Sequence, residues 1–324
     1  MRRKLLAVIA VAIPGTLAAC GGGNSGGGTS PSTSAGTTAT CPSGTQTSGN
    51  GTTLSIGAKG FAEEELMAQM TADVLDAHGF NVTDTFTAAD KAIGTALTTG
   101  TIDMYWQYTG TELGDYLGLT NFPTALAAAF TYVQQKDQAN GLCWVAPTQF
   151  DDTNGIAIKS SQSGTFGSSL AAFGTYLTSH PNTKVCIMSE FLTRPDGLPG
   201  LVSTYGWPSA ASFHYQQIGT TAEKAIASGQ CDAGEVFTTD SAIQVNNEVT
   251  LTDDKNLFPP DNAGLVLRSS VLQKNPSIGA WMAPVAAKWT TPVMLSLNAL
   301  VEVQNQTVAS VAHTWLLQNG FVSS

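Results

Sequence analysis

The sequence lacks the motifs that mark most enzymes and metal proteins. It has no Cys-x-x-Cys pair, and its four histidines are scattered along the chain, which argues against a metal site. It also has no Gly-x-Ser-x-Gly, no His-Glu-x-x-His and no Ser-His-Asp arrangement that stands out. The acids at 63–65 are consecutive and point around a predicted helix, where acids of the first turn normally complement the helix dipole. We therefore expect a protein that is not an enzyme and that holds no metal and no cofactor.

Basic residues are also scarce. The chain has 14 Lys and Arg against 24 Asp and Glu, and three of the basic residues stand at positions 2–4. An acidic surface repels phosphate groups, so neither nucleic acid nor anionic lipid is expected as a main partner.

The N-terminal apolar run is too short to cross a membrane. Three basic residues precede the run from Leu5 to Leu17, which ends in the segment LAAC, whose cysteine is Cys20. A transmembrane anchor is the weaker alternative, because a span needs roughly 20 apolar residues. The pattern predicts a lipoprotein signal peptide over residues 1–20, with Cys20 lipidated. The mature protein is then expected outside the cytoplasm, attached to the cell membrane through its lipid.

The segment after Cys20 lacks both charge and aromatic side chains. Residues 21–40 are Gly, Ser, Thr, Ala, Pro and Asn, ahead of Cys41, and such a stretch cannot bury enough apolar surface to fold. We assign residues 21–50 to a flexible tether. A chain of this composition has an end-to-end distance of roughly 25 Å, which lets a folded body meet a partner at the membrane.

Four cysteines remain for the folded body, and an even number in an exported protein predicts two disulfides. Four cysteines allow three pairings. Cys186 and Cys231 each begin a strand-like run in the middle third of the chain, while Cys41 and Cys143 flank the first third. We favour Cys41 with Cys143 and Cys186 with Cys231.

From residue 52 onwards, short strand-like runs alternate with amphipathic helical runs, which predicts an α/β fold with a mostly parallel sheet covered by helices. The predicted strands span 54–57, 81–86, 102–106, 143–145, 155–158, 185–188, 212–218, 233–237 and 264–267. The predicted helices span 62–77, 90–98, 124–138, 198–205 and 221–228, with further helices from 277 to the end. We assign 51–154 and 262–324 to lobe one and 155–261 to lobe two, so that two crossover strands join the lobes beside a ligand cleft.

Two segments of the first lobe carry polar or aromatic groups at the ends of predicted strands. Lys59-Gly60-Phe61 stands between a strand and a helix, where free backbone N–H groups and a lysine favour an anion, although an ordinary turn with a solvated lysine gives the same pattern. Three aromatics lie between 105 and 108, and aromatic faces attract cations. Because alternate aromatics on a strand are usually core, Tyr108 is the preferred cleft residue.

A third segment, Arg194-Pro195-Asp196-Gly197, precedes a predicted helix in the second lobe. Asp196 is a plausible helix cap, which would leave the Arg194 guanidinium to bind a ligand carboxylate. A surface ion pair is the alternative for this arginine.

Taken together, these segments resemble one family. Five blocks, spread over almost the whole body, resemble the ProX/OpuAC-type quaternary-amine-binding proteins: IGAKGFAE (56–63), DMYWQYTGT (103–111), EFLTRPDGLPGL (190–201), FTTD (237–240) and FPP (258–260). The resemblance implies a type II periplasmic-binding-protein fold. It also implies a receptor, expected to be monomeric, that delivers glycine betaine, proline betaine, carnitine or choline to the membrane permease subunits of an ABC importer.

The resemblance also implies the ligand contacts. By position, Lys59 and Thr111 from lobe one and Arg194 from lobe two grip the ligand carboxylate. Tyr108 matches the first tyrosine of the cage around the trimethylammonium group.

Three other cage tyrosines are replaced in this chain. Asn154 follows the run Asp-Asp-Thr at 151–153, Phe237 precedes Thr-Thr-Asp, and Asp261 follows Pro-Pro. Asp261 either pairs with a cationic ligand, hydrogen-bonds the hydroxyl groups of a larger ligand stacked on Trp106 and Phe237, or only caps the return to lobe one. The candidate ligand contacts are Lys59, Trp106, Tyr108, Thr111, Asp152, Asn154, Arg194, Phe237 and Asp261.

These residues predict the solute-binding component of an ABC importer for a quaternary amine such as glycine betaine. The alternative is the same scaffold with another ligand, such as a hydroxylated aromatic solute. A cell-envelope hydrolase and a purely structural envelope protein are more distant alternatives.

Overall fold

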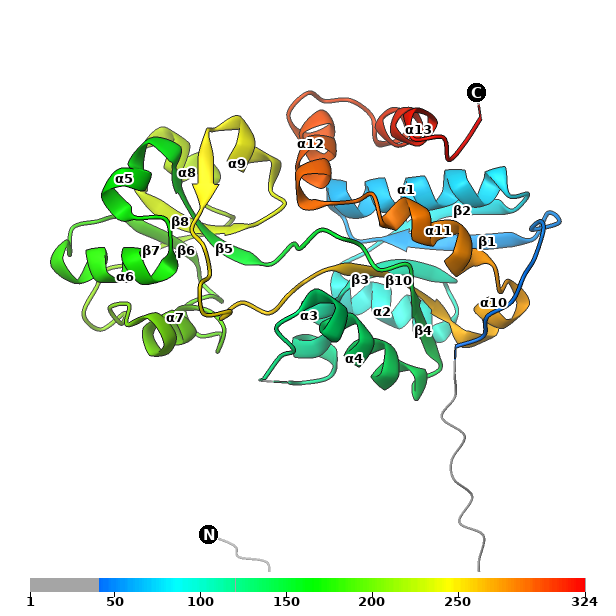
Figure 1. Ribbon diagram of the computed structural model, residues 1–324, viewed down its shortest axis with the longest axis horizontal. Coiled ribbons are helices and arrows are strands. Elements are labelled where there is room, and N and C mark those ends of the chain that lie inside the picture. The colour runs from blue at the N-terminus through cyan, green and yellow to red at the C-terminus, as the bar shows by residue number, and fades with distance from the viewer. Residues whose placement is uncertain (1–40, 120, 324) are drawn as a thin grey trace, which may run out of the picture. The chain divides into compact units, whose positions relative to one another are not determined.

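The computed structural model describes residues 41–119 and 121–323 (Figure 1). The predicted signal peptide with Cys20, and the tether up to residue 40, lie outside the described residues. The body contains two five-stranded sheets, each with its own helices, within one compact unit. We refer to them as the first and the second lobe.

The first sheet has the strand order β2-β1-β3-β10-β4. Its strands are β1 (Thr53–Ala58), β2 (Asn81–Thr87), β3 (Met104–Tyr108), β4 (Leu142–Val145) and β10 (Ala263–Arg268). β1 pairs in parallel with β2 and β3, whereas β10 runs antiparallel to β3 and β4. The last strand to join is therefore inserted between two early ones, because the chain returns to this lobe only after building the second.

The second sheet repeats this plan with the order β7-β6-β8-β5-β9. Its strands are β5 (Asn154–Lys159), β6 (Val185–Met188), β7 (Gln216–Ile218), β8 (Ala233–Phe237) and β9 (Glu248–Thr250). β6 is parallel to β7 and β8, and β5 is antiparallel to β8 and β9. Both sheets are mixed: one strand in each, β10 in the first and β5 in the second, runs against the others, as these pairings show.

Helices cover both sheets (Figure 1). The first lobe carries α1 (Ala62–Ala77), α2 (Asp90–Thr99), α3 (Thr109–Thr111), the π-helical turn η1 (Glu112–Tyr116), α4 (Leu126–Gln138), α10 (Ser269–Lys274), α11 (Ile278–Ala286), α12 (Thr291–Glu302) and α13 (Val308–Gln318). The second carries η2 (Ser160–Gln162), α5 (Ser163–Phe166), α6 (Leu170–Ser179), α7 (Leu198–Tyr205), α8 (Glu223–Ser228) and α9 (Ser241–Val245). Among the described residues, every helix is too short or too polar to cross a membrane.

Helix α1 shows how sequence pattern becomes core. Its predicted apolar face is buried, with Leu66, Met67, Met70 and Leu75 fully enclosed against the first sheet. Burying a side chain of this size contributes about 1.5–3 kcal/mol. After His78 the helix gives way to Gly79, whose φ of 84° is one that glycine adopts without strain.

The structure contains both predicted disulfides, Cys41–Cys143 and Cys186–Cys231, with Cα atoms 5.6 and 5.9 Å apart. The first disulfide joins residue 41 to β4. Residues 41–50, which we assigned to the tether, contact the first lobe through Gln46 N, which donates to Ser277 Oγ at 2.6 Å, and through the backbone N–H of residue 49, which donates to the carbonyl of residue 78.

Two crossover segments, 146–153 and 251–262, connect the sheets and bond to each other. The Asp261 backbone N–H donates to Asp151 Oδ1 at 2.7 Å, and the Asp152 N–H donates to the Asp261 carbonyl at 3.1 Å. Thr153 Oγ1 donates to the Pro259 carbonyl at 2.6 Å. The two connections therefore form one hydrogen-bonded unit between the lobes.

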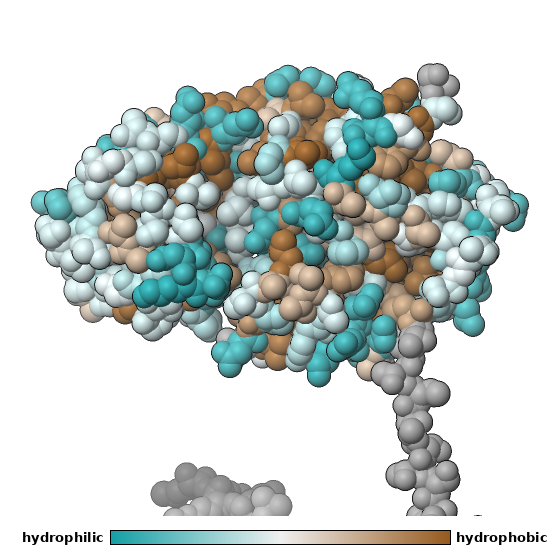
Figure 2. Space-filling view, in the orientation of Figure 1, coloured by the Kyte–Doolittle hydropathy of each residue, from teal (hydrophilic) through white to brown (hydrophobic). Residues whose placement is uncertain are grey.

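The surface of the body is mixed in character. On the face shown in Figure 2, hydrophilic and hydrophobic residues are interspersed over both lobes.

Candidate functional site

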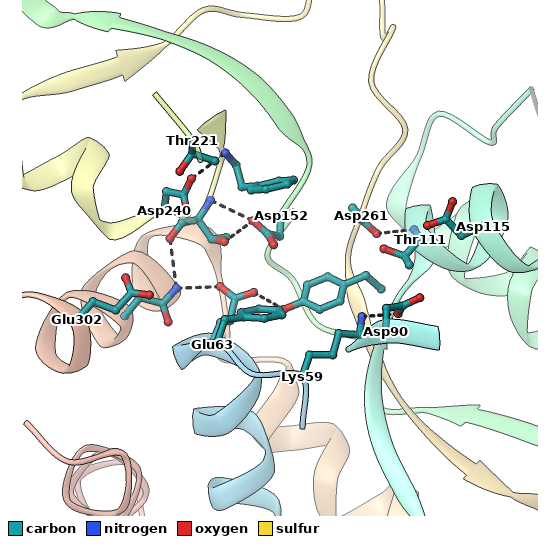
Figure 3. Close-up of a pocket in the computed structure, with 15 residues that line it drawn as sticks. Lys59, Glu63, Asp90, Thr111, Asp115, Asp152, Thr221, Asp240, Asp261 and Glu302 are labelled. Carbon is teal, nitrogen blue, oxygen red and sulfur yellow. Dashed lines mark hydrogen bonds and ion pairs between the residues drawn. The ribbon is translucent and has the colours of Figure 1, made fainter. Parts of the chain in front are cut away.

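A cavity of about 510 Å³ lies where loops from both lobes meet at the crossover segments (Figure 3). The loops after β1 and β3, the starts of α1 and α2, the crossovers, the loop after β8 and helix α12 all contribute. The lining residues are Lys59, Phe61, Glu63, Asp90, Tyr108, Thr111, Asp115, Asp152, Thr221, Phe237, Thr239, Asp240, Asp261, Asn298 and Glu302. The site thus combines residues from opposite ends of the sequence.

Lys59 stands at the end of β1, where the chain turns into α1. Its Nζ donates to Gln107 Oε1 at 2.6 Å and lies 3.2 Å from Asp90 Oδ1. It also lies 3.8 Å from Glu64 Oε1 and 4.7 Å from the centroid of the Tyr108 ring. This buried ammonium is therefore already neutralised by carboxylates of its own lobe.

Glu63 is the acceptor at the centre of a hydrogen-bond network that reaches both lobes. Tyr108 Oη donates to Glu63 Oε1 at 2.6 Å, and Asn298 Nδ2 donates to Glu63 Oε2 at 3.0 Å. The same Asn298 nitrogen donates to the Thr239 carbonyl of the second lobe at 3.2 Å, and Ser241 Oγ donates to Glu302 Oε2 at 2.6 Å. Helix α12 therefore bridges the lobes beside the cavity.

Three aromatic rings line the cavity, and they are not equally accessible. The Tyr108 ring is 3% exposed and packs against Phe61 and Phe150, each with its centroid 6.2 Å away. Phe61 is 40% exposed, and Phe237 is half-buried at the end of β8. The ring surface open to a ligand therefore comes mainly from Phe61 and Phe237.

Asp261 stands on the second crossover and supports the loop after β3. Its Oδ1 accepts from the N–H of Gly110 at 2.5 Å and of Thr111 at 3.3 Å. A Cβ at Gly110 would lie 2.8 Å from Asp261 Cγ, so glycine permits this approach. Burial raises the pKa of Asp261 to about 7, although these two N–H groups and Lys59 oppose the rise.

Acidic side chains dominate the lining of the cavity. Seven carboxyl groups line it, and Lys59 is its one Lys or Arg among the described residues. Burial raises the pKa of Glu63, and burial reinforced by the charge of Glu63 raises that of Asp152 well above its ordinary range. Burial, the hydrogen bond to Glu223 and the charge of Glu223 raise the pKa of Asp240 to about 9. The raised pKa values favour the protonated forms in the empty site, and a positive charge brought in by a ligand would favour the ionised forms.

A second cavity, of about 600 Å³, adjoins the first and shares Thr111, Asp115, Phe237 and Asp261 with it. Arg194 lines this second cavity. Its Nε donates to Asp196 Oδ1 at 3.1 Å and its Nη2 to Asp196 Oδ2 at 2.6 Å, the ion pair named as the alternative for this arginine. We expected Asp196 to cap a helix, and this prediction was wrong. Helix α7 begins at Leu198, and its N-cap is Gly197.

The structure places the candidate ligand contacts in three groups. The first cavity holds Lys59, Tyr108, Thr111, Asp152, Phe237 and Asp261. The second holds Thr111, Asn154, Arg194, Phe237 and Asp261. Trp106 lines neither: it is fully buried, donates from Nε1 to Thr71 Oγ1 at 2.9 Å and packs edge-on against Trp289. The interpretation of Trp106 as a ligand contact is therefore replaced by a core role, which alternation along β3 favours.

Several lining residues escaped the sequence analysis. Glu63 had been treated as a helix-dipole acid, although it is 2% exposed, and Phe61 had been considered only as part of a turn. The others are Asp90, Asp115, Thr221, Thr239, Asp240, Asn298 and Glu302. In the part of the chain that the structure describes, no group of three or more His, Cys, Asp or Glu is arranged to hold a metal ion.

Two α/β lobes joined by two crossovers, with a cavity between them, define a solute-binding protein of the periplasmic-binding class. The fold prediction is confirmed: apo YehZ from Escherichia coli superposes with a TM-score of 0.71 at 25% identity, over 84% of this chain and 99% of that one. The family described as OpuAC, the substrate binding domain of ABC-type glycine betaine transport systems, matches residues 52–318, and the chain belongs to it. This also confirms that the chain is a binding protein and not an enzyme.

Two relatives show the range of the family. The glycine-betaine-binding protein of Pseudomonas aeruginosa is 31% identical over 274 residues, which cover 82% of this chain and 88% of that protein. The ergothioneine transport permease/ergothioneine binding protein EgtU of Helicobacter pylori is 25% identical over 270 residues, 82% of this chain and 48% of that protein.

Proposed function

We propose that the first cavity binds the cationic head of a quaternary amine such as glycine betaine, and that the chain presents this solute to the permease of an ABC importer. One observation carries the proposal: accessible rings of Phe61 and Phe237 lie in a cavity lined by seven carboxyl groups, while its one lysine is already paired. A trimethylammonium group makes no hydrogen bonds, so aromatic faces and nearby negative charge are what recognise it. The name of the relative from Pseudomonas aeruginosa supports this ligand class.

The carboxylate of such a ligand would be held at the boundary of the two cavities. Thr111 and Arg194 line the second cavity from opposite lobes, and Thr111 also lines the first. Arg194 acts when the lobes close, exchanging Asp196 for the ligand carboxylate. A contact made only in the closed state shifts the population toward closure, which is how binding becomes a signal to the permease.

The anchoring proposal rests on the sequence alone. Lipidation at Cys20 would keep the mature protein at the outer face of the cell membrane, where residues 21–40 give it reach. We propose that it works there as a monomer.

A second ligand class is favoured by the changes in the cage. Asn154 and Asp261 stand where the family resemblance implies tyrosines, so part of the cage around a trimethylammonium group is missing. A solute without a quaternary amine, such as a hydroxylated aromatic, is therefore the alternative.

Isothermal titration of the mature chain carrying Cys20→Ser tests both classes. The panel is glycine betaine, proline betaine, carnitine, choline, ergothioneine and a hydroxylated aromatic acid. Micromolar binding of a trimethylammonium compound supports the proposal, and Arg194→Ala should weaken the carboxylate-bearing ligands more than choline. Binding only of ligands without a quaternary amine would contradict it.

A further inference from the structure

The second cavity contains an unpaired polar group that the proposed function does not use. Asn154, the first residue of β5, is 7% exposed, and its Oδ1 is buried without a hydrogen-bond partner in the described part of the chain. An acceptor buried in this way costs about 1–3 kcal/mol unless something donates to it. The side chain lines the second cavity, so a turn of its amide group would bring this oxygen within reach of a donor on a bound solute.

The register of the second sheet sets this group beside the first cavity. Asn154 pairs with Phe237 across the antiparallel strands β5 and β8, and directly opposed residues project from the same face of a sheet. Phe237 lines both cavities, whereas Asn154 lines only the second. A ligand that passes the Phe237 ring from the first cavity therefore reaches Asn154.

The two cavities share part of their lining. Thr111, Asp115, Phe237 and Asp261 line both, so the two spaces are compartments of one cleft. The first compartment is acidic and aromatic. The second also has carboxyl groups and aromatic rings in its lining, and it adds the guanidinium of Arg194 and the unpaired acceptor of Asn154.

We propose that the second compartment is a subsite for the polar end of a solute longer than glycine betaine, and that Asn154 Oδ1 selects solutes with a hydrogen-bond donor at that end. The solute class is then a cation whose far end carries both an N–H or O–H donor for Asn154 and an acceptor for Arg194. This inference rests on the proposed function, since the first compartment must hold the cationic head.

Carnitine and γ-butyrobetaine give a matched test, because they differ only in the hydroxyl of carnitine. In the mature Cys20→Ser chain, titration should show that carnitine binds about fivefold or more tightly than γ-butyrobetaine, the value of one well-made hydrogen bond. Both should bind more tightly than the shorter glycine betaine. In Asn154→Leu the advantage of the hydroxyl should disappear, which is the signature of a direct coupling.

Melting of the ligand-free protein gives a second readout. Asn154→Leu should raise the melting temperature, because leucine has a similar volume to asparagine and carries no polar atom that would be left unpaired. Asn298→Leu is the control and should lower it, because Asn298 is also buried and has an unpaired Oδ1 among the described residues, but its Nδ2 donates to Glu63 and Thr239 and both hydrogen bonds are lost.

Three outcomes overturn the inference. They are tighter binding of glycine betaine than of carnitine, survival of the hydroxyl advantage in Asn154→Leu, and a loss of stability in that variant like the loss in Asn298→Leu. If no trimethylammonium compound binds at all, the proposed function fails and the subsite falls with it.

Discussion

Arg194 and Asp196, two residues apart, form a two-point ion pair at the edge of the second cavity, with N···O distances of 3.1 and 2.6 Å. Any ligand carboxylate that uses Arg194 must displace Asp196 from it. The ion pair therefore lowers the affinity for ligands that carry a carboxylate and leaves the affinity for other ligands unchanged.

Removing this competitor should favour carboxylate-bearing ligands. In Asp196→Ala, the affinity for glycine betaine should rise by about two- to tenfold, the value of a partly exposed charged hydrogen bond. Choline lacks a carboxylate and serves as the control ligand in the same titrations. An equal change for both ligands would show that Asp196 acts on the fold and not through Arg194.

Binding of a permanent cation should depend on pH. The pKa of Asp261 is raised to about 7 from its ordinary 3.8, so the cavity gains negative charge as the pH rises toward 7. Choline affinity should therefore rise by up to about tenfold per pH unit below pH 7. Because choline itself does not titrate in this range, titrations from pH 5 to pH 8 report the protein alone.

The raised pKa of Asp261 makes stability fall with pH, whereas it makes choline affinity rise. A carboxyl group with a raised pKa binds its proton more tightly in the folded state, so its contribution to the free energy of unfolding is lost as the pH rises from about 4 to about 7. Asp261→Asn keeps the acceptor for Gly110 and should reduce both pH dependences. Unchanged profiles in this variant would assign them to other groups, such as Asp152 or Glu63.

Phe61 should contribute to cation binding at little cost in stability. Its ring is 40% exposed at the first cavity, and a cation on an aromatic face gains about 0.5–2 kcal/mol, so Phe61→Ala should weaken choline by roughly 2- to 30-fold. Phe61→Tyr should retain most of the affinity. Leu317→Ala, on α13 and 37% exposed, is the control for loss of an exposed apolar side chain, and its binding constant should match the parent's.

The disulfide between Cys41 and Cys143 should be a major source of stability. It closes a loop of 102 residues, for which chain entropy alone gives about 4–5 kcal/mol. The double variant Cys41→Ala/Cys143→Ala should lose free energy of unfolding of about this size in urea titrations. Cys186→Ala/Cys231→Ala, with a separation of 45, should lose slightly less. A loss below about 1 kcal/mol in the first variant would mean that structure in the unfolded chain already brings these ends together.

Hydrophobic periodicity located most helices and strands because it depends on neighbours along the chain. The helix predicted over 62–77 and the strand predicted over 233–237 have those bounds in the structure. Periodicity does not report strand direction, so the antiparallel placement of β10 was missed. Helix α6 was also missed, since Leu170–Ser179 lacks charged residues that would mark a solvent face.

The candidate site was predictable where a residue ends a strand or follows it directly, as Phe237 and Lys59 do. Asn298 and Glu302 reach the cavity from α12, more than 230 residues after Glu63, and no local pattern links such distant positions. Trp106 failed because it lies on the same face of β3 as Tyr108 but two residues before the end of the strand, where its side chain packs against Thr71 and Trp289 and does not reach the cavity.

The bond between Cys41 and β4 also decides how mechanical load enters the protein. A pull on the chain preceding residue 41 passes through the disulfide to Cys143, which lies on a strand paired with β10. The force bypasses β1 and the segment between β1 and Cys143, so pulling does not peel the N-terminal strand from the first sheet. A thiol-reducing environment would move the point of attachment to the weaker hydrogen bonds at residues 46 and 49.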